Sequence, residues 1–452
     1  MERGQGMATG NSLTGSVKVR KLQTVPHAKA KEEPDRRFHA LIDKVRRTDF
    51  LMEAWARVRR NGGSAGVDGE TSEGIEPSGP ERWPGELSRE LREGTCRPKP
   101  VRQVLIPEKQ PGGFRPLGIP CIRDRVARTS AMPVPEPVFG ADLQPERYAY
   151  RPGRGAKDAV RRVHSLLDTG HNEVVDCDLS NHFGGIPHAG LMRSVARRVS
   201  DGRMPGLIKA WLEMPVEEDD GEGGKRRTDR ARRQRKGTPQ GSPVSVLLSN
   251  LHMRRFIPGW KLSGHTRRFR SEIVNYADDI CVPGKAPAAE MLSVVRRIMD
   301  RLKLPVNERK TRCLRCPEEP IGFPGYRIGR NHRTEGRGPY IGTRPGKAGV
   351  QGICRRVSEQ TAGRNALIPA EVMVKRLNRI PSGWAECCDP GQVSPACKSV
   401  DAHAARRLRR WLCRKRRVRT GKSARFPDEV LWNDCGLIRP ASRTKSLPWA
   451  KA

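Results

Sequence analysis

The chain has 452 residues, too many for one compact core, and this length indicates two or three domains. Its 87 lysine and arginine residues exceed its 50 aspartate and glutamate residues by 37, an excess that indicates a polyanionic partner. The sequence contains neither the roughly 18 consecutive apolar residues that cross a bilayer nor a secretory signal or a disulfide-rich pattern. We therefore exclude membrane residence and expect a cytoplasmic location.

Apolar periodicity and turn residues predict the elements of the first half of the chain. Residues 1–35 are polar and basic without a sustained period, and we expect a loosely ordered leader there. The elements predicted next are helices within 36–60, a glycine-rich loop at 61–66, a β-hairpin formed by 101–107 and 114–120, a helix at 156–167 and a strand at 173–179. On that strand Asp176 and Asp178 share one face, because side chains two residues apart point the same way.

The second half of the chain continues with alternating helices and strands. Pro187 opens a predicted helix, because proline is tolerated in a first helical turn. Two short strands, 273–276 and 280–282, are predicted to form a hairpin with Ala277-Asp278-Asp279 at its tip, and a helix follows at 291–302. Beyond Gly346 the pattern is helical and increasingly basic. This order predicts an α+β core followed by a helical region.

Three carboxylates are anchored on predicted sheet: those of Asp178, Asp278 and Asp279. Like charges held so close together repel unless a cation lies between them, and carboxylate oxygens are ligands for divalent cations. Two such cations can activate a hydroxyl and stabilise the leaving oxygen of an in-line phosphoryl transfer. The three acids therefore indicate nucleotidyl transfer, although the string Tyr276-Ala277-Asp278-Asp279 alone is also typical of an Asp-rich turn.

Several short blocks surround these acids in order along the chain. They are Asn61 to Gly69, Val104 to Pro107, Arg115 to Pro120, Tyr148 to Arg154, Asp176 to Leu179, Gly237 to Gly241, Tyr276 to Asp279, Asn307 to Thr311, and Gly325-Tyr326. Together they resemble the reverse transcriptases and maturases encoded by bacterial group II introns. The resemblance extends from about Lys31 to Ala452, and the segment from Val374 to Trp384 resembles the start of the family's maturase, or thumb, domain.

The resemblance implies a fold and a set of domains. The fold would be a right-hand polymerase, α+β in its fingers and palm, followed by an α-helical thumb/maturase domain. The implied domains are a basic leader at 1–35, fingers and palm at 36–345, and an RNA-binding thumb/maturase domain at 346–452. No Cys/His framework of a zinc-bearing endonuclease accompanies Cys435, so we expect no DNA cleavage by this chain.

Roles carry over only at matched positions. The resemblance implies that Asp178, Asp278, Asp279 and the backbone carbonyl of Leu179 hold two Mg²⁺ ions. It assigns nucleotide binding to Arg115, Phe183 and Gln240, with Phe183 rejecting a 2′-hydroxyl and Arg115 holding the triphosphate, and primer/template contact to Lys310, Gly325 and Tyr326. From the residues alone, Phe183 could also be a buried aromatic, Arg115 an exposed surface arginine, and the Gln240 block a turn.

The segment 401–420 combines a basic run with apolar residues at helical spacing. This pattern predicts a helix with one buried and one basic face. The basic residues that we assign to RNA binding are Arg406, Arg407, Arg410, Arg414 and Lys415. Recognition of an intron RNA would rest on phosphate contacts and on RNA shape.

Some positions depart from the family pattern. Gly184 stands where the family usually has Asp, Ser242 where it has Gly, and Pro324 where it has Leu, and Pro133 and Pro135 interrupt a segment that is helical in the family. We expect an RNA-directed DNA polymerase that acts on intron RNA, an RNA template, a DNA primer or target and deoxynucleoside triphosphates, and that assists splicing and mobility. Two alternatives remain: a catalytically weakened maturase that only binds RNA, and a domesticated reverse transcriptase in phage defence.

Overall fold

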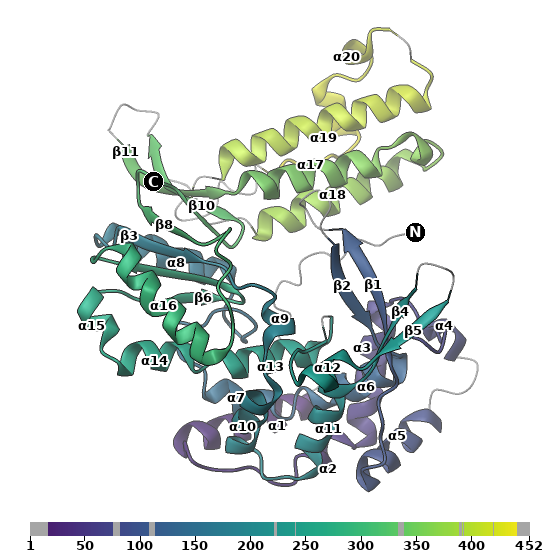
Figure 1. The fold of residues 1–452 in the computed structure, drawn as a ribbon. Coiled ribbons are helices and arrows are strands. Elements are labelled where there is room, and N and C mark those ends of the chain that lie inside the picture. Colours follow the sequence, from purple (N-terminus) through teal and green to yellow (C-terminus); the bar gives the residue numbers. More distant parts are fainter. Residues whose placement is uncertain are drawn as a thin grey trace.

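The computed structural model describes residues 17–75, 82–107, 114–220, 224–239, 241–332, 339–387, 391, 393–418 and 420–440. Within these ranges the protein is a mixed α and β fold whose strands form three sheets (Figure 1). In this view a helical group formed by α17, α18 and α19 lies beside β10 and β11 and above the strands of the other two sheets. Among the described helices, none is both long and apolar enough to span a membrane.

The N-terminal helices are α1 (Val17–Glu32), α2 (Ile42–Val45), α3 (Thr48–Asn61), α4 (Ser72–Ile75) and α5 (Arg82–Glu93). Helix α1 corrects the expectation of a loosely ordered leader for residues 17–32, while residues 1–16 lie outside the described part of the chain. Ala30 is buried, and the Arg198 guanidinium donates to the carbonyls of Ala30 and Glu33, at 2.8 and 2.9 Å. This anchor is distant in sequence, so the local pattern could not reveal it.

The fingers sheet has the strand order β2-β1-β4-β5. Its strands are β1 (Val101–Pro107), β2 (Phe114–Ile119), β4 (Val216–Asp219) and β5 (Lys225–Thr228). β1 and β2 are antiparallel, which confirms the predicted pair of strands, and β1 also runs parallel to β4. The helices around this sheet are α6 (Ile122–Ala131), α7 (Glu136–Ala141), α10 (His188–Arg198), α11 (Arg203–Glu213), α12 (Arg230–Gln234) and α13 (Pro243–Met253).

The palm sheet has the strand order β6-β7-β3-β8 and carries the three acids at one end. Its strands are β3 (Glu173–Cys177), β6 (Val274–Tyr276), β7 (Asp279–Gly284) and β8 (Arg312–Arg315). Every neighbouring pair is antiparallel. The flanking helices are α8 (Ala156–Asp168), α9 (His182–Gly185), α14 (Phe256–Leu262), α15 (His265–Phe269) and α16 (Ala288–Leu302).

Alternating side chains bury both faces of the palm sheet. Val175 and Val282 belong to the large core that includes α16, whereas Val174 and Cys281 pack into a second core with α8. Period-two alternation sends neighbouring side chains of one strand to opposite faces, so each strand is fixed in register from both sides. This packing makes the end of the sheet a rigid platform for the residues that follow β3 and precede β7.

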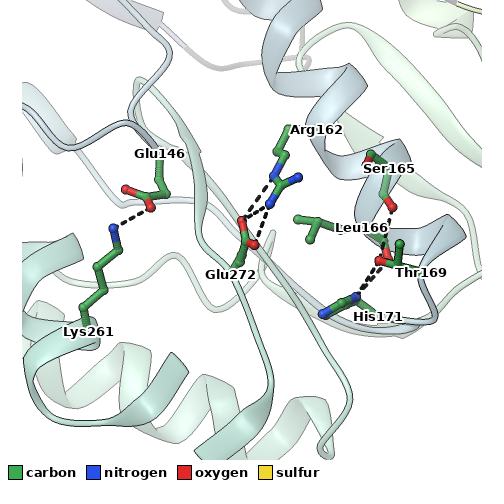
Figure 2. A network of polar contacts seen from close by, with 8 residues as sticks. All are labelled: Glu146, Arg162, Ser165, Leu166, Thr169, His171, Lys261 and Glu272. Atoms are coloured by element: carbon green, nitrogen blue, oxygen red, sulfur yellow. Dashed lines mark hydrogen bonds and ion pairs between the residues drawn. The ribbon is translucent and has the colours of Figure 1, made fainter. Parts of the chain in front are cut away.

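Two ion pairs fasten the outer edge of the palm sheet (Figure 2). Arg162 on α8 donates to both carboxylate oxygens of Glu272, two residues before β6, at 2.5 and 2.6 Å. Lys261 on α14 lies 2.5 Å from the carboxylate of Glu146. These side chains line a cavity of about 420 Å³. They hold the segment around Glu146 beside β6.

The third sheet, with the order β11-β10-β9, connects the palm to the C-terminal helices. It consists of β9 (Ile321–Phe323), β10 (Tyr326–His332) and β11 (Pro339–Pro345). After it come α17 (Lys347–Gln360), a 3₁₀ turn at Gly363–Asn365, α18 (Ala370–Cys387), α19 (Ser394–Lys415), α20 (Lys422–Arg425) and a π-helical turn at Val430–Asp434. α17, α18 and α19 pack around their own cores, so the predicted helical C-terminal region is confirmed.

Candidate active site

The three acids meet at one end of the palm sheet because of the register of β3, β6 and β7. Cys177 pairs with Ile280, and continuing this antiparallel register sets Asp178 opposite Asp279. Tyr276 pairs with Asp279 across the two-residue turn that contains Ala277 and Asp278. Ala277 has φ of 57°, a left-handed conformation that costs energy for a residue with a side chain. The backbone therefore holds this turn in a strained, specific shape.

The charges of these acids act on one another. Burial, followed by the negative charges of Asp278 and Asp178, raises the pKa of Asp279 to about 7. Burial and the charge of Asp178 also raise the pKa of Asp278, while Arg115 and Lys310 partly oppose that rise. Burial raises the pKa of Asp176 to about 6. This cluster of partly buried negative charge favours the binding of a cation.

One segment after α16 secures Asp178 from three directions. The Asn307 side-chain amide donates to the Asp178 carboxylate at 3.1 Å, and the Asn307 backbone N–H donates to the Asp178 carbonyl at 2.8 Å. The Asp178 backbone N–H donates to the Thr311 hydroxyl oxygen at 3.3 Å. The Lys310 ammonium lies 3.5 Å from the same carboxylate. The sequence assigns a role only to Lys310 and misses Asn307 and Thr311, although all three belong to the Asn-x-x-Lys-Thr block.

The donor set suits a hard divalent cation. Three carboxylates on rigid elements offer only oxygen ligands, which Mg²⁺ prefers. Among the described residues, no group of three or more His, Cys, Asp or Glu side chains is assembled to hold a metal ion. The ammonium of Lys310 supplies positive charge beside Asp178. The residues thus fit the ion in chemistry and in placement on the sheet.

Of the three residues predicted to bind nucleotide, the structure describes Arg115 and Phe183. Arg115 lies on β2 opposite Ile106, and its positive charge partly opposes the rise in the pKa of Asp278. Phe183 is half-buried on the short helix α9, and its carbonyl accepts the Thr238 backbone N–H at 2.8 Å. Leu179 directly follows Asp178 and forms a bridge with Val306. Gln240 lies outside the described residues.

The residues predicted to contact primer and template are placed differently from one another. Gly325 occupies the tight turn between β9 and β10, with φ of 82°. The Tyr326 side chain is buried in the core shared with α8, which leaves only its backbone for such a contact. Strand β10 turns that side chain inward, so the predicted contact of Tyr326 with primer or template would be made by its backbone. Lys310 lies against Asp178 within the acid cluster.

The departures from the family pattern acquire a structural meaning. Pro324 precedes Gly325 in the β9–β10 turn, and proline followed by a residue with positive φ suits a type II turn, so no strand hydrogen bond is lost there. Ser242 is buried immediately before α13. A Cβ atom at Gly184 would lie 2.5 Å from the side-chain nitrogen of Asn181, so the glycine accommodates that neighbour. Pro133 and Pro135 fall between α6 and α7.

The basic residues of α19 divide into two groups. Arg406, Arg410 and Arg414 are exposed and follow one another at four-residue spacing, which places them on one helical face. Arg407 instead donates to the Thr361 hydroxyl and the Ser358 carbonyl, at 2.9 and 2.8 Å. Lys415 donates to the Ile368 carbonyl at 2.9 Å. The last two side chains therefore hold α19 against the end of α17 and the loop after it, a role that sequence spacing does not show.

Comparisons with known proteins agree with this geometry. Residues 106–328 match the family reverse transcriptase (RNA-dependent DNA polymerase), and residues 350–426 match the group II intron, maturase-specific domain. Protein YkfC of Escherichia coli is 29% identical over 70% of this chain and 90% of its own length. The group II intron-encoded protein LtrA of Lactococcus lactis is 23% identical over 63% of this chain, and the match spans 44% of LtrA.

Among solved structures, telomerase from Candida albicans with the TWJ fragment of telomeric RNA matches 79% of this chain and 67% of that one, at 9% identity and a TM-score of 0.41. The family match over the palm, together with the acid-bearing hairpin, defines the class as reverse transcriptase. The chain belongs to the reverse transcriptases and maturases encoded by group II introns. Its α+β polymerase fold agrees with the prediction from sequence.

Proposed function

We propose that this protein is an RNA-directed DNA polymerase that also assists the splicing and mobility of a group II intron. The observation that carries the proposal is the convergence of Asp178, Asp278 and Asp279 at the end of the palm sheet. The proposed reaction adds deoxynucleotides to a primer 3′-hydroxyl along an RNA template and releases pyrophosphate. The proposed setting is the cytoplasm.

The proposed site residues divide the work of this reaction. The three carboxylates and the Leu179 carbonyl would hold two Mg²⁺ ions, which when bound activate the 3′-hydroxyl and neutralise charge on the reacting phosphoryl group. Arg115, on the fingers hairpin, would bind the triphosphate with its planar guanidinium. Phe183, half-buried on α9, would line the sugar pocket and exclude a 2′-hydroxyl. Asn307 and Lys310 would orient Asp178.

RNA binding rests on the helical C-terminal region. Its match to the maturase-specific domain supports an RNA partner, and the exposed face of α19 offers Arg406, Arg410 and Arg414 to phosphates. Most of the excess charge of +37 would therefore serve RNA binding, and little of it would act at the acids. We propose that intron RNA and the RNA template contact this face, and that a DNA primer or target enters beside the palm.

The second candidate is a maturase that binds RNA without competent polymerisation. The close approach of Asn181 to Gly184, next to Phe183, favours it, because the family's usual aspartate does not fit beside Asn181 as that side chain lies. Pro324 no longer favours it, because this proline lies in a turn.

One experiment separates the two candidates. Primer extension on an RNA template and RNA affinity are measured together for the parent protein and for Asp279→Asn. Extension by the parent, lost in the variant with RNA affinity retained, supports the polymerase. RNA binding by the parent without deoxynucleotide incorporation supports the maturase alone. Equal extension by both proteins would refute the assignment of the acid.

A further inference from the structure

Arg147 is fully buried beside the strand that leads to the Tyr276–Asp279 turn. Its segment joins β6 through a bridge between Arg147 and Asn275, with backbone hydrogen bonds from Tyr148 N–H to the Asn275 carbonyl at 2.9 Å and from Asn275 N–H to the Glu146 carbonyl at 3.0 Å. Among the ion pairs that the described residues form, none includes Arg147. Its guanidinium instead donates to the side-chain oxygens of two asparagines, Asn250 and Asn275.

The Asn275 side chain passes this anchor on to the turn. Arg147 Nη1 donates to the Asn275 Oδ1 atom, which leaves the Nδ2 atom to face the turn. That nitrogen donates to the Ala277 carbonyl at 3.1 Å and to the Asp279 carbonyl at 2.9 Å. The two acceptors flank Asp278 in sequence. One amide therefore fixes the backbone on both sides of a proposed metal ligand.

Asn250, on α13, completes the arrangement from the other side. Its Oδ1 atom accepts from Arg147 Nε and Nη2, at 2.8 and 2.6 Å. Its Nδ2 atom donates to the carbonyls of Ala149 and Tyr150, at 3.2 and 3.4 Å. Tyr150, like Ala277, has a left-handed backbone, with φ of 56°. A single guanidinium thus supports two strained bends that both lie near Asp278.

Burying this cation is costly. Desolvation lowers the pKa of Arg147 to about 9, and the negative charge of Asp278 is among the effects that oppose the fall. An apolar side chain would fill the same space without that cost. The guanidinium provides what an apolar side chain lacks: several donors in a fixed planar fork and a positive charge behind the acids. These two properties explain its presence better than packing alone.

We propose that Arg147 is a positioning residue for the proposed polymerase reaction: acting through Asn275, it holds the Ala277–Asp279 backbone in the shape that lets the acids bind metal. This inference rests on the proposed function for its reaction, but its geometry concerns metal binding as such. Arg147 touches neither the acids' carboxylates nor a substrate. Its effect is therefore expected on metal affinity and on kcat, and not on KM for the primer and template.

The test uses Arg147→Lys and Asn275→Asp in the full chain, with Arg128→Met as the matched control. Lysine keeps the charge but loses the planar fork. Aspartate still accepts from Arg147 but cannot donate to the turn, and its added negative charge would by itself strengthen metal binding. Arg128 is likewise a fully buried arginine, but it lies on α6 in the fingers and donates to the Met214 sulfur at 2.7 Å. Circular dichroism establishes that each variant is folded.

Two measurements decide the outcome: the dissociation constant for Mn²⁺ alone, by electron paramagnetic resonance, and primer extension as a function of Mg²⁺. We expect Arg147→Lys and Asn275→Asp each to weaken Mn²⁺ binding and to lower kcat by about tenfold or more, with KM for primer and template unchanged. Arg128→Met should leave both measurements unchanged. Unchanged Mn²⁺ affinity in a folded variant, or equal weakening by Arg128→Met, would overturn the proposal.

The two proposals can fail separately. A parent protein that binds Mn²⁺ but incorporates no deoxynucleotide would contradict the proposed polymerase and leave the Mn²⁺ comparison to decide the role of Arg147. If Arg147→Lys does not fold, Asn275→Asp decides alone, because a buried arginine beside an aspartate keeps a partner.

Discussion

Replacing Asp279 by asparagine should make the metal-free protein more stable while removing its proposed activity. Burial and the neighbouring acids raise the pKa of this carboxyl from 3.8 to about 7. Between these values the folded protein holds a proton that the unfolded chain does not, so the free energy of unfolding falls as pH rises. Three pKa units at about 1.4 kcal/mol each give a cost of about 4 kcal/mol at pH 8, as an upper bound.

The assay is thermal unfolding in EDTA from pH 4 to pH 8, for the parent and for Asp279→Asn. Asparagine carries no charge, so the cost disappears in the variant at every pH. The difference in unfolding temperature should be near zero at pH 4, grow through pH 5 to 7, and level off at pH 8. A variant that is no more stable than the parent at pH 8, or a difference independent of pH, would show that the Asp279 carboxylate does not destabilise the folded protein.

Three further predictions concern the C-terminal helices and the departures from the family. Arg407→Ala should destabilise the helical region by about 1–3 kcal/mol, because it leaves the end of α17 without its donors, and should change RNA affinity little. Arg410→Ala should leave stability nearly unchanged and weaken RNA binding. It should also reduce the salt dependence of RNA binding by about one ion, as measured by filter binding at several salt concentrations. Pro324→Ala should cost about 0.5–1 kcal/mol in denaturant unfolding, since proline restricts the unfolded chain, and a gain in stability would contradict the turn assignment. Gly184→Asp should destabilise the protein, and adding Asn181→Gly should recover part of the loss; strict additivity of the two changes would show that these residues do not compete for space.

Much of the fold could be predicted from the sequence because periodicity records which side of an element is buried. The predicted bounds of the 101–107 strand coincide with β1, and the predicted helix at 156–167 with α8 to within one residue. The predicted strand at 173–179 is shorter, ending at Cys177, because Asp178 leaves the ladder to bond with Asn307 and Thr311. Placing the acids at one sheet end followed from the short turn between two apolar strands.

The rest could not be predicted because it depends on polar partners distant in sequence. Arg147 bonds with Asn250 and Asn275, which lie 103 and 128 positions away. The sequence does not distinguish Arg407 from the other basic residues of α19, because its acceptor, the Ser358 carbonyl, lies on a different helix. The same holds for α1, whose anchor Arg198 lies 168 positions beyond Ala30. Local patterns give the buried face of a helix, but not the carbonyls or amides that a particular guanidinium reaches.

We propose above that the acids at the end of the palm sheet carry RNA-templated nucleotidyl transfer. The most direct test is incorporation of a single deoxynucleotide in one turnover, on a primer annealed to RNA in the presence of Mg²⁺, by the parent and by Asp278→Asn. We expect the parent to extend the primer and the variant, still folded and still bound to RNA, to be slower by about a thousandfold or more. Extension at the same rate by both proteins would contradict it.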